Sequence, residues 1–320
     1  MISGDRRSLA RLITLLERGD ETIFQVLEDI HPHTGQAYSI GVTGPPGAGK
    51  STILDGLIYL IRQENQKVGV LAVDPTSPLT GGAVLGDRIR MQRHYLDEDV
   101  FIRSLATRGN SGGLSRITLG AVKLLDAYGV DTVIVETVGV GQTEVEVMGV
   151  VDTVVVVLVP ESGDAIQAMK AGLLEVADIF VINKADRPGA QRLASEVRTM
   201  LNMAESRPWW RPPILLTQAY TGEGLDELLE SIRTHRRSLE DSSRLLQKRV
   251  HRRRSEFLRI LEEGLRLEID SAVSGETEVA NYLQQVERGL FDPQAAALKV
   301  LRDGSLLRSL LDLLDKRPNA

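Results

Sequence analysis

Seven short apolar runs alternate with helix-like stretches along the middle of the chain, and this alternation restricts the fold more than any other feature. It predicts an α/β fold, in which a mostly parallel sheet carries helices on both faces. Such sheets bind ligands beside the carboxyl ends of their strands, so we expect the functional residues in the loops that follow the apolar runs. The apolar runs are residues 38–44, 67–74, 100–106, 131–137, 152–159, 178–183 and 213–218, and the helix-like stretches include 50–64, 114–128, 164–177, 189–203 and 224–237.

The two ends of the chain differ from this alternating middle. The first 36 residues carry apolar side chains at helical spacing, among them Leu9, Ile13 and Leu16, and predict one or two short helices. The tail has apolar-periodic stretches with few glycines and prolines, which also predicts helices. We therefore divide the chain into an N-terminal helical segment (1–36), a central α/β domain (37–236) and a C-terminal helical extension (237–320).

Composition excludes several classes of protein. Cysteine is absent, which excludes a disulfide scaffold, a zinc–thiolate site, an iron–sulfur cluster and a cysteine nucleophile. A net charge of −6 argues against a nucleic-acid partner. The most apolar run, Thr153–Val159, is far shorter than the roughly 20 residues that cross a bilayer, and the charged N-terminus does not read as a secretory signal. We expect a cytoplasmic protein with neither a membrane nor a nucleic-acid partner.

The segment GPPGAGKS, residues 44–51, stands directly after a strand-like run and directly before a helix-like stretch. This is the G-x-x-x-x-G-K-[ST] pattern in the context it requires, and it predicts a P-loop that binds a nucleoside triphosphate. Its glycines let backbone N–H groups turn toward phosphate oxygens, and the helix that follows adds its dipole. Lys50 would contact the β- and γ-phosphates, and Ser51 would bind Mg²⁺. The predicted phosphate-binding residues are Gly44, Pro45, Pro46, Gly47, Ala48, Gly49, Lys50, Ser51 and Thr52.

The segment NKAD, residues 183–186, ends a later strand-like run and predicts that the base is guanine. Asp186 can accept hydrogen bonds from the N1–H and exocyclic amine of guanine, a donor pair that adenine lacks. Asn183 would support this loop, and the stem of Lys184 would cover the ring. GTPases usually place a Ser-Ala pair after the next strand, where a backbone N–H meets the guanine oxygen. Here Gln218 and Ala219 stand in that place, which leaves the backbone donor available, so the predicted ligands are GTP and GDP.

The segment ETVGVGQTE, residues 136–144, follows the strand-like run that ends at residue 137. Most GTPases have D-x-x-G at this point, and here the four residues run from Glu136 to Gly139. Glu136 could hold the Mg²⁺ shell, and the Gly139 N–H could contact the γ-phosphate. Val140 follows Gly139, so the glutamine that orients water in Ras-type enzymes is missing and we expect slow hydrolysis by the isolated protein.

Two aspartates are further candidates for the metal site, and each has a simpler alternative. Asp74 ends a strand-like run, where it could instead cap a turn with Pro75. Asp87 lies in a loop that could fold over the nucleotide, but it could also cap the helix-like stretch that follows. Arg108 lies in a glycine-bearing loop and could neutralise charge in the transition state or play no part in it.

Five segments in this order resemble the MeaB/ArgK family of GTPases: VDPTSPLTGGAVLGDRIRM (73–91), ATRGNSGG (106–113), ETVGVGQTEVEV (136–147), VPESGDAIQAMKAG (159–172) and NKAD. The resemblance covers residues 5–235 well and the tail loosely. It implies a P-loop NTPase-type fold, with 37–236 as the GTPase domain. It also implies that Lys50, Glu136 and Asp87 serve catalysis, and that Mg²⁺ is bound by Ser51, Asp74, Asp87 and Glu136.

The same resemblance implies a chaperone role. The family gates cofactor loading of an adenosylcobalamin-dependent acyl-CoA mutase, usually methylmalonyl-CoA mutase, and protects it with the help of GTP hydrolysis. The family also implies a homodimer built partly by residues 237–320. The loop 161–170 would respond to the nucleotide through Asp164 and Lys170, although a helix start capped by Ser162 and Asp164 explains that loop equally well.

Two other functions stay open from the sequence. A phosphotransferase, as in a transport-system kinase, would use the same P-loop, whereas a nickel metallochaperone would need thiol or clustered imidazole ligands that the chain lacks. Two further features need an interpretation. The basic run 244–254 is typical of an RNA-binding helix, of a docking patch for an acidic partner or, as we favour, of the solvated face of a helix. Trp209 and Trp210 are interpreted as part of a loop packed on the domain.

Overall fold

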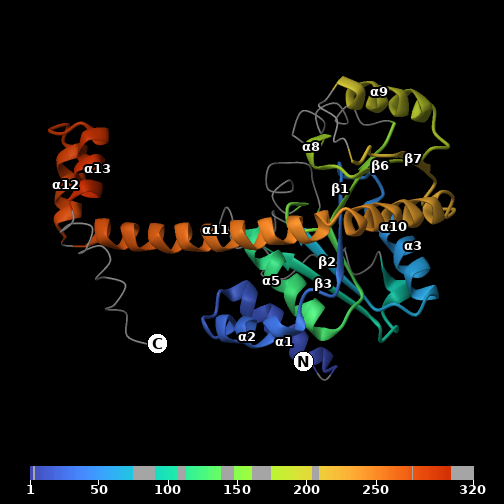
Figure 1. The fold of residues 1–320 in the computed structure, drawn as a ribbon, viewed down its shortest axis with the longest axis horizontal. Coiled ribbons are helices and arrows are strands. Elements are labelled where there is room, and N and C mark those ends of the chain that lie inside the picture. The colour runs from blue at the N-terminus through green and yellow to red at the C-terminus, as the bar shows by residue number, and fades with distance from the viewer. Residues whose placement is uncertain are drawn as a thin grey trace. The chain divides into compact units, whose positions relative to one another are not determined.

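The computed structural model describes residues 1–2, 4–74, 91–106, 113–137, 148–160, 174–203, 209–275 and 277–303. The chain forms an α/β fold around a seven-stranded sheet in which every neighbouring pair of strands is parallel (Figure 1). The strand order is β3-β2-β4-β1-β5-β6-β7. The strands are β1 (Tyr38–Thr43), β2 (Val68–Asp74), β3 (Val100–Ala106), β4 (Thr132–Thr137), β5 (Thr153–Leu158), β6 (Ile179–Asn183) and β7 (Ile214–Thr217).

The sheet confirms the fold expected from the alternation. Each strand lies within one of the seven apolar runs and differs from it by at most one residue at either end. The helices that precede or follow these strands are α1 (Arg6–Arg18), α2 (Thr22–Ile30), α3 (Lys50–Gln63), α5 (Gly113–Tyr128), α8 (Leu174–Val176), α9 (Ala190–Met203) and α10 (Leu225–Asp241), with two 3₁₀ turns at His31–His33 and Gln92–His94. Of the helix-like stretch 164–177, only its end lies in the described residues.

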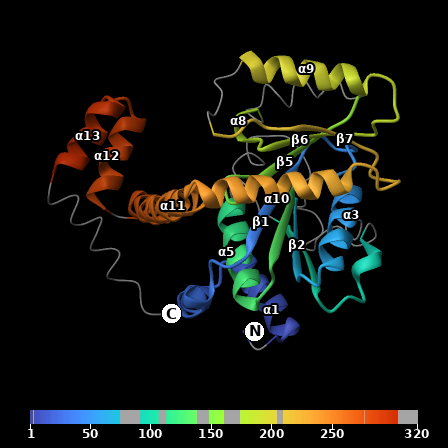
Figure 2. The same cartoon turned by 45° about the vertical axis from the view of Figure 1, so that its right-hand side comes forward.

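Two apolar cores lie on opposite faces of the sheet, because successive strand side chains point to opposite sides. On β5, Val155 and Val157 belong to the core beneath α3 and α10. Val154 and Val156 belong to the other core, which α1, α2, α5 and α9 cover. Figure 2 shows α9 beside β6 and β7. Coverage of both faces explains why the strands read as continuous apolar runs rather than alternating ones.

The chain divides into two compact units, Met1–Arg249 and Val250–Ala320. The tail is helical in its described part, as expected: it contains α11 (Arg244–Ser274), α12 (Glu278–Glu287) and α13 (Pro293–Arg302). The divisions at 36/37 and 236/237 stay predictions. Among the described residues, no helix has both the length and the apolar character needed to cross a membrane.

Lys248 and Arg249, in the middle of the basic run, form an anchor rather than part of a solvated face, which corrects our interpretation of the run at these two positions. The Arg249 guanidinium donates to the Asp152 carboxylate at 2.7 Å, and it also donates to the carbonyls of Gly35 (2.7 Å) and Ala37 (2.8 Å). Lys248 donates to the Asp152 carbonyl at 2.7 Å. Burial acts to lower the pKa of Arg249, but the hydrogen bond and the charge of Asp152 outweigh it and raise that pKa, so Arg249 stays cationic.

The two tryptophans pack on the domain, as predicted. The Trp210 indole N–H donates to the carbonyl of Asp178 at 2.7 Å, and its ring lies 4.7 Å from the ring of the fully buried His235. The guanidinium of Arg244 lies over the Trp209 ring, 5.0 Å from its centre. Both rings are therefore engaged within the first unit.

Replacing Arg249 by methionine should destabilise the first unit. The Asp152 side chain is 1% exposed, so the substitution would remove the guanidinium that donates to a buried carboxylate, and we expect a loss of about 3 kcal/mol in the free energy of unfolding. Urea unfolding followed by circular dichroism measures it. Arg253→Met, at an exposed position of the same helix, is the matched control, and equal midpoints for the two variants would contradict the anchor.

Candidate functional site

The loop of residues 44–49 joins the end of β1 to the start of α3, where the sequence places the P-loop. It passes through a space that admits only glycine at its first position. A Cβ on Gly44 would lie 2.1 Å from the Val157 carbonyl oxygen, and the residue has a φ of +149°. Pro45 and Ala48 are buried, whereas Pro46, Gly47 and Thr52 are exposed at the mouth of the loop. The loop therefore packs on the end of the sheet through its buried residues and faces solvent through its exposed ones.

Lys50 and Ser51 begin α3, and both side chains are buried. The Lys50 ammonium donates to the carbonyls of Gly44 (2.8 Å) and Pro45 (3.0 Å), so its charge lies against the loop. A cation held on the loop carbonyls is already positioned beside the space that phosphate oxygens would fill. The N-terminal N–H groups of α3 add positive potential at the same place.

Ser51 meets Glu136, the acidic residue expected near the metal. The Ser51 hydroxyl donates to the Glu136 carboxylate at 2.8 Å, and both groups are buried. The pair forms because β1 and β4 are neighbours in register, which places Glu136 opposite Val42 just below the loop. A hydroxyl and a carboxylate are the hard oxygen donors that Mg²⁺ takes, and a nucleotide-bound Mg²⁺ needs only one or two protein ligands. The residues present therefore fit a Mg²⁺ ion.

The side chains of the other two predicted metal residues lie outside the described part of the chain. Asp74 is the last residue of β2, but its side chain lies outside the described residues. Asp87, Gly139, Arg108 and the loop 161–170 also lie outside them. Within the described part of the chain, no three His, Cys, Asp or Glu side chains form a ready metal cluster. Ser51 and Glu136 are the two predicted metal residues that the structure brings together.

The amide of Asn183 connects three loops. It is 3% exposed, and its Nδ2 group donates to the Ala48 carbonyl of the P-loop at 2.8 Å. Its Oδ1 atom accepts from the Thr217 hydroxyl and from the Ala219 N–H, each at 3.1 Å. The sequence predicted support of the base loop by Asn183, but the contact with the P-loop follows only from the strand order, in which β6 and β7 lie on the same side of β1 as β5.

Lys184 and Asp186 lie where the sequence placed them, in the turn that leaves β6. Lys184 has a left-handed backbone with a φ of +57°, and the N–H of the next residue, Ala185, donates to the Thr217 carbonyl at 3.0 Å. This turn is thereby fixed to the end of β7, and the Asp186 side chain is exposed. An exposed carboxylate on a fixed turn is free to meet a ligand from solvent.

The loop after β7 differs in one respect from what the sequence suggested. The Ala219 N–H, expected to face a guanine oxygen, donates to Asn183 instead. The Gln218 amide is also engaged, because it donates to the Glu223 carboxylate and the backbones of these two residues pair across a tight turn. A base that approaches this loop would therefore have to share the Ala219 N–H with Asn183.

Sequence reasoning missed a pair of threonines beneath the loop. Thr137, the last residue of β4, donates its hydroxyl to that of Thr43, the last residue of β1, at 2.8 Å. Both side chains are buried. The signal was available, since each threonine lies at or next to the end of an apolar run and stands beside a predicted site residue, but pairing them required the order of the strands.

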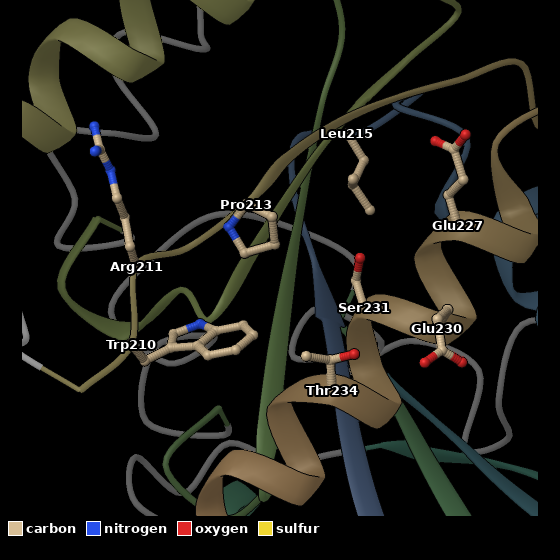
Figure 3. Close-up of a pocket in the computed structure, with 8 residues that line it drawn as sticks. All are labelled: Trp210, Arg211, Pro213, Leu215, Glu227, Glu230, Ser231 and Thr234. Carbon is tan, nitrogen blue, oxygen red and sulfur yellow. The ribbon is translucent and has the colours of Figure 1, made fainter.

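A separate cavity of about 460 Å³ lies between helix α10 and the segment 210–215, which leads into β7 (Figure 3). Trp210, Pro213 and Leu215 form its apolar side, and Ser231 and Thr234 of α10 face them. Its lining includes none of the P-loop or NKAD residues, so it is distinct from the site described above.

Comparisons with known proteins find relatives that are named as GTPases. The family model described as "Methylmalonyl Co-A mutase-associated GTPase MeaB" matches residues 9–274. A Pyrococcus abyssi protein named as a GTPase is 50% identical over 95% of this chain and 94% of its own length. GTPase ArgK of Escherichia coli is 41% identical over 77% of each chain, and the mouse "Methylmalonic aciduria type A homolog, mitochondrial" is 32% identical over 94% of this chain and 77% of its own.

One solved structure resembles almost the whole chain. The crystal structure described as "LAO/AO transport system kinase" has a TM-score of 0.70 and 30% sequence identity, and the match covers 98% of this chain and 95% of the other.

Replacing Asn183 by alanine should loosen the site as a whole. The substitution would leave the buried Thr217 hydroxyl and Ala219 N–H without their acceptor, at a cost of about 1–3 kcal/mol for each group left unpaired. We expect the affinity for GDP, measured by isothermal titration calorimetry, to fall by about ten- to a hundredfold. Asn202→Ala, at an exposed position of α9, is the control, and unchanged affinity in Asn183→Ala would contradict the role of this amide.

Proposed function

The chain belongs to the MeaB family of GTPases and hydrolyses GTP, and we propose that it acts as a Mg²⁺-dependent chaperone of an adenosylcobalamin-dependent acyl-CoA mutase. In this role the GTPase gates cofactor loading and protects the mutase, and methylmalonyl-CoA mutase is the proposed partner. The observation that carries the proposal is the joining of the P-loop, the NKAD turn and the loop after β7 by one buried amide, in a chain whose family is described as mutase-associated.

We assign the triphosphate to the loop of residues 44–49 and the first turn of α3, including Thr52. Lys50 would move from the loop carbonyls to the phosphates, and the Gly139 N–H would meet the γ-phosphate. Ser51 and Glu136 would hold Mg²⁺, together with Asp74 and Asp87. Bound Mg²⁺ would neutralise charge on the phosphates during hydrolysis. In this assignment Lys50, Glu136 and Asp87 are the catalytic residues.

We assign the guanine base to the NKAD turn and the loop after β7. Asp186 would accept from its N1–H and exocyclic amine, and the Lys184 stem would lie over the ring. The Ala219 N–H would share its hydrogen between Asn183 and the guanine oxygen. The present bond from this N–H to Asn183 is 3.1 Å long. One N–H can donate to two acceptors in a three-centre hydrogen bond, so the bond to Asn183 does not prevent a second one to the base.

The chaperone role is supported by the residue that follows Gly139 in the sequence. Val140 stands where Ras-type enzymes carry the glutamine that orients water, so the isolated protein should hydrolyse GTP slowly. A partner that completes the site would then couple hydrolysis to its own state. The name of the mouse relative refers to methylmalonic aciduria, which supports a methylmalonyl-CoA enzyme as the partner.

We also propose a homodimer, supported by an apolar stripe on α11. Val250, Phe257, Leu261 and Leu265 recur at helical spacing and are 40–66% exposed. Between 250 and 303, the described side chains that are buried are Ala272, Val279, Ala280 and Ala296. The few buried side chains of this segment offset little of the conformational entropy that the segment loses on folding. A second copy of the chain that covers the stripe would bury the apolar side chains that are now exposed.

Replacing Asp186 by asparagine should change the preferred base. The asparagine Nδ2 group would meet the guanine amine donor to donor, whereas the carbonyl that xanthine carries at that position would accept from it. We expect GDP affinity to fall about a hundredfold and xanthosine diphosphate to bind more tightly than GDP, as measured by displacement of a fluorescent nucleotide. Asp241→Asn, at the exposed end of α10, should change neither. Retained GDP preference would contradict the assigned role of Asp186.

The partner is tested by mixing the protein with purified methylmalonyl-CoA mutase and measuring masses by light scattering during size exclusion. The protein alone should give twice 35.1 kDa, and a complex should form in amounts that differ between GDP and a non-hydrolysable GTP analogue. Free phosphate should be the labelled product from γ-labelled GTP. No complex with either nucleotide would contradict the chaperone role, and label transferred to a protein would favour a phosphotransferase.

A further inference from the structure

The hydroxyl bond between Thr137 and Thr43 lies at the point where β1 and β4 separate. Their backbone pairing extends as far as Val42 opposite Glu136. One residue further, Thr137 donates to Thr43 at 2.8 Å, and the side chains are 1% and 0% exposed. A bond between side chains thus continues the link between the two strands beyond their backbone ladder.

Each of these threonines is covalently next to a residue of the site. Thr43 precedes Gly44, the first residue of the P-loop, and Thr137 follows Glu136. On its other side Thr43 is in register with Val156 of β5, and Gly44 is pressed against the Val157 carbonyl. The base of the loop is therefore held by β5 on one side and by the hydroxyl of Thr137 on the other.

The contact that depends on this spacing is the one between Ser51 and Glu136. Ser51 is carried by α3, which follows the P-loop, whereas Glu136 is carried by β4. Their 2.8 Å hydrogen bond joins groups 85 residues apart in the chain, and its length reflects how far β4 lies from the loop. A hydroxyl bond is short and directional, so it holds that distance more narrowly than apolar packing does.

We propose that Thr43 and Thr137 are positioning residues for Mg²⁺: their hydroxyl bond sets the separation between the P-loop and Glu136, and thereby the affinity for the metal. They act through Ser51 and Glu136 rather than by touching the ligand. This inference rests on the proposed binding of Mg²⁺ by those two residues. The metal-free affinity for nucleotide should not depend on the threonine pair.

The test compares Thr137→Val, Thr43→Val, the double valine variant and Thr137→Ser. Valine keeps the branched shape and removes the hydroxyl, whereas serine keeps the hydroxyl. For each variant, GDP affinity is measured in EDTA and across a Mg²⁺ titration, and urea unfolding is measured in parallel. Thr132→Val is the matched control, since Thr132 is a buried threonine at the opposite end of the same strand.

In Thr137→Val, the Mg²⁺ concentration for half-maximal tightening of GDP should rise about five- to tenfold, while affinity in EDTA stays within about twofold. The serine variant and the Thr132→Val control should keep the wild-type requirement. The double valine variant should show the same raised Mg²⁺ requirement as Thr137→Val, because both variants lack the hydroxyl bond that sets the spacing.

Two outcomes would overturn the inference alone: an unchanged Mg²⁺ requirement in folded Thr137→Val, or a wild-type Mg²⁺ requirement in the folded double variant, either of which would mark a purely structural role for the pair. Wild-type protein whose GDP affinity does not respond to Mg²⁺ would instead contradict the proposed metal site itself, and the inference with it. The two failures are thereby distinguishable.

Discussion

The hydrogen bonds of the Asn183 amide are the interaction on which the site depends most. One end of the amide donates to the P-loop, and the other accepts from two groups at the end of β7. Because the group is buried, water does not replace a lost partner, so the three loops keep their positions together. In the proposed function, the loops at the phosphate end and at the base end of the nucleotide must be fixed relative to one another, and this amide links them.

The two ends of the parallel sheet carry different kinds of polar group. At the carboxyl ends, a hydroxyl and a carboxylate, those of Ser51 and Glu136, pair with one another. At the amino ends, the buried carboxylates of Asp152 and Asp178 are matched by Arg249 and Lys248 of α11. A buried carboxylate is costly unless a cation pairs with it, which gives Lys248 and Arg249 of the basic run a structural role. The same run attaches the first turns of α11 to the sheet.

Much of the fold and the chemistry of the site could be predicted from short stretches of sequence. The strand bounds follow from runs of β-branched and apolar residues, which must be buried on both faces of a parallel sheet. The positions of Lys50 and Asp186 follow from local spacing, because a P-loop and an NKAD turn each form within a few neighbouring residues. The anchor formed by Arg249 could not be read in this way, since a basic helix gives the same local pattern whether its partner is solvent or a buried carboxylate.

The sequence by itself therefore determined which segments form strands and helices and which loops carry the phosphate and base motifs, since these depend on neighbours within a few residues. Only the tertiary structure decided which motifs meet. Asn183 reaches Ala48 across 135 residues, and Thr137 reaches Thr43 across 94. Both contacts exist because β1 lies between β4 and β5 in the sheet, with β6 and β7 beyond β5. That order depends on how all seven strands and their helices pack together, which no local pattern contains.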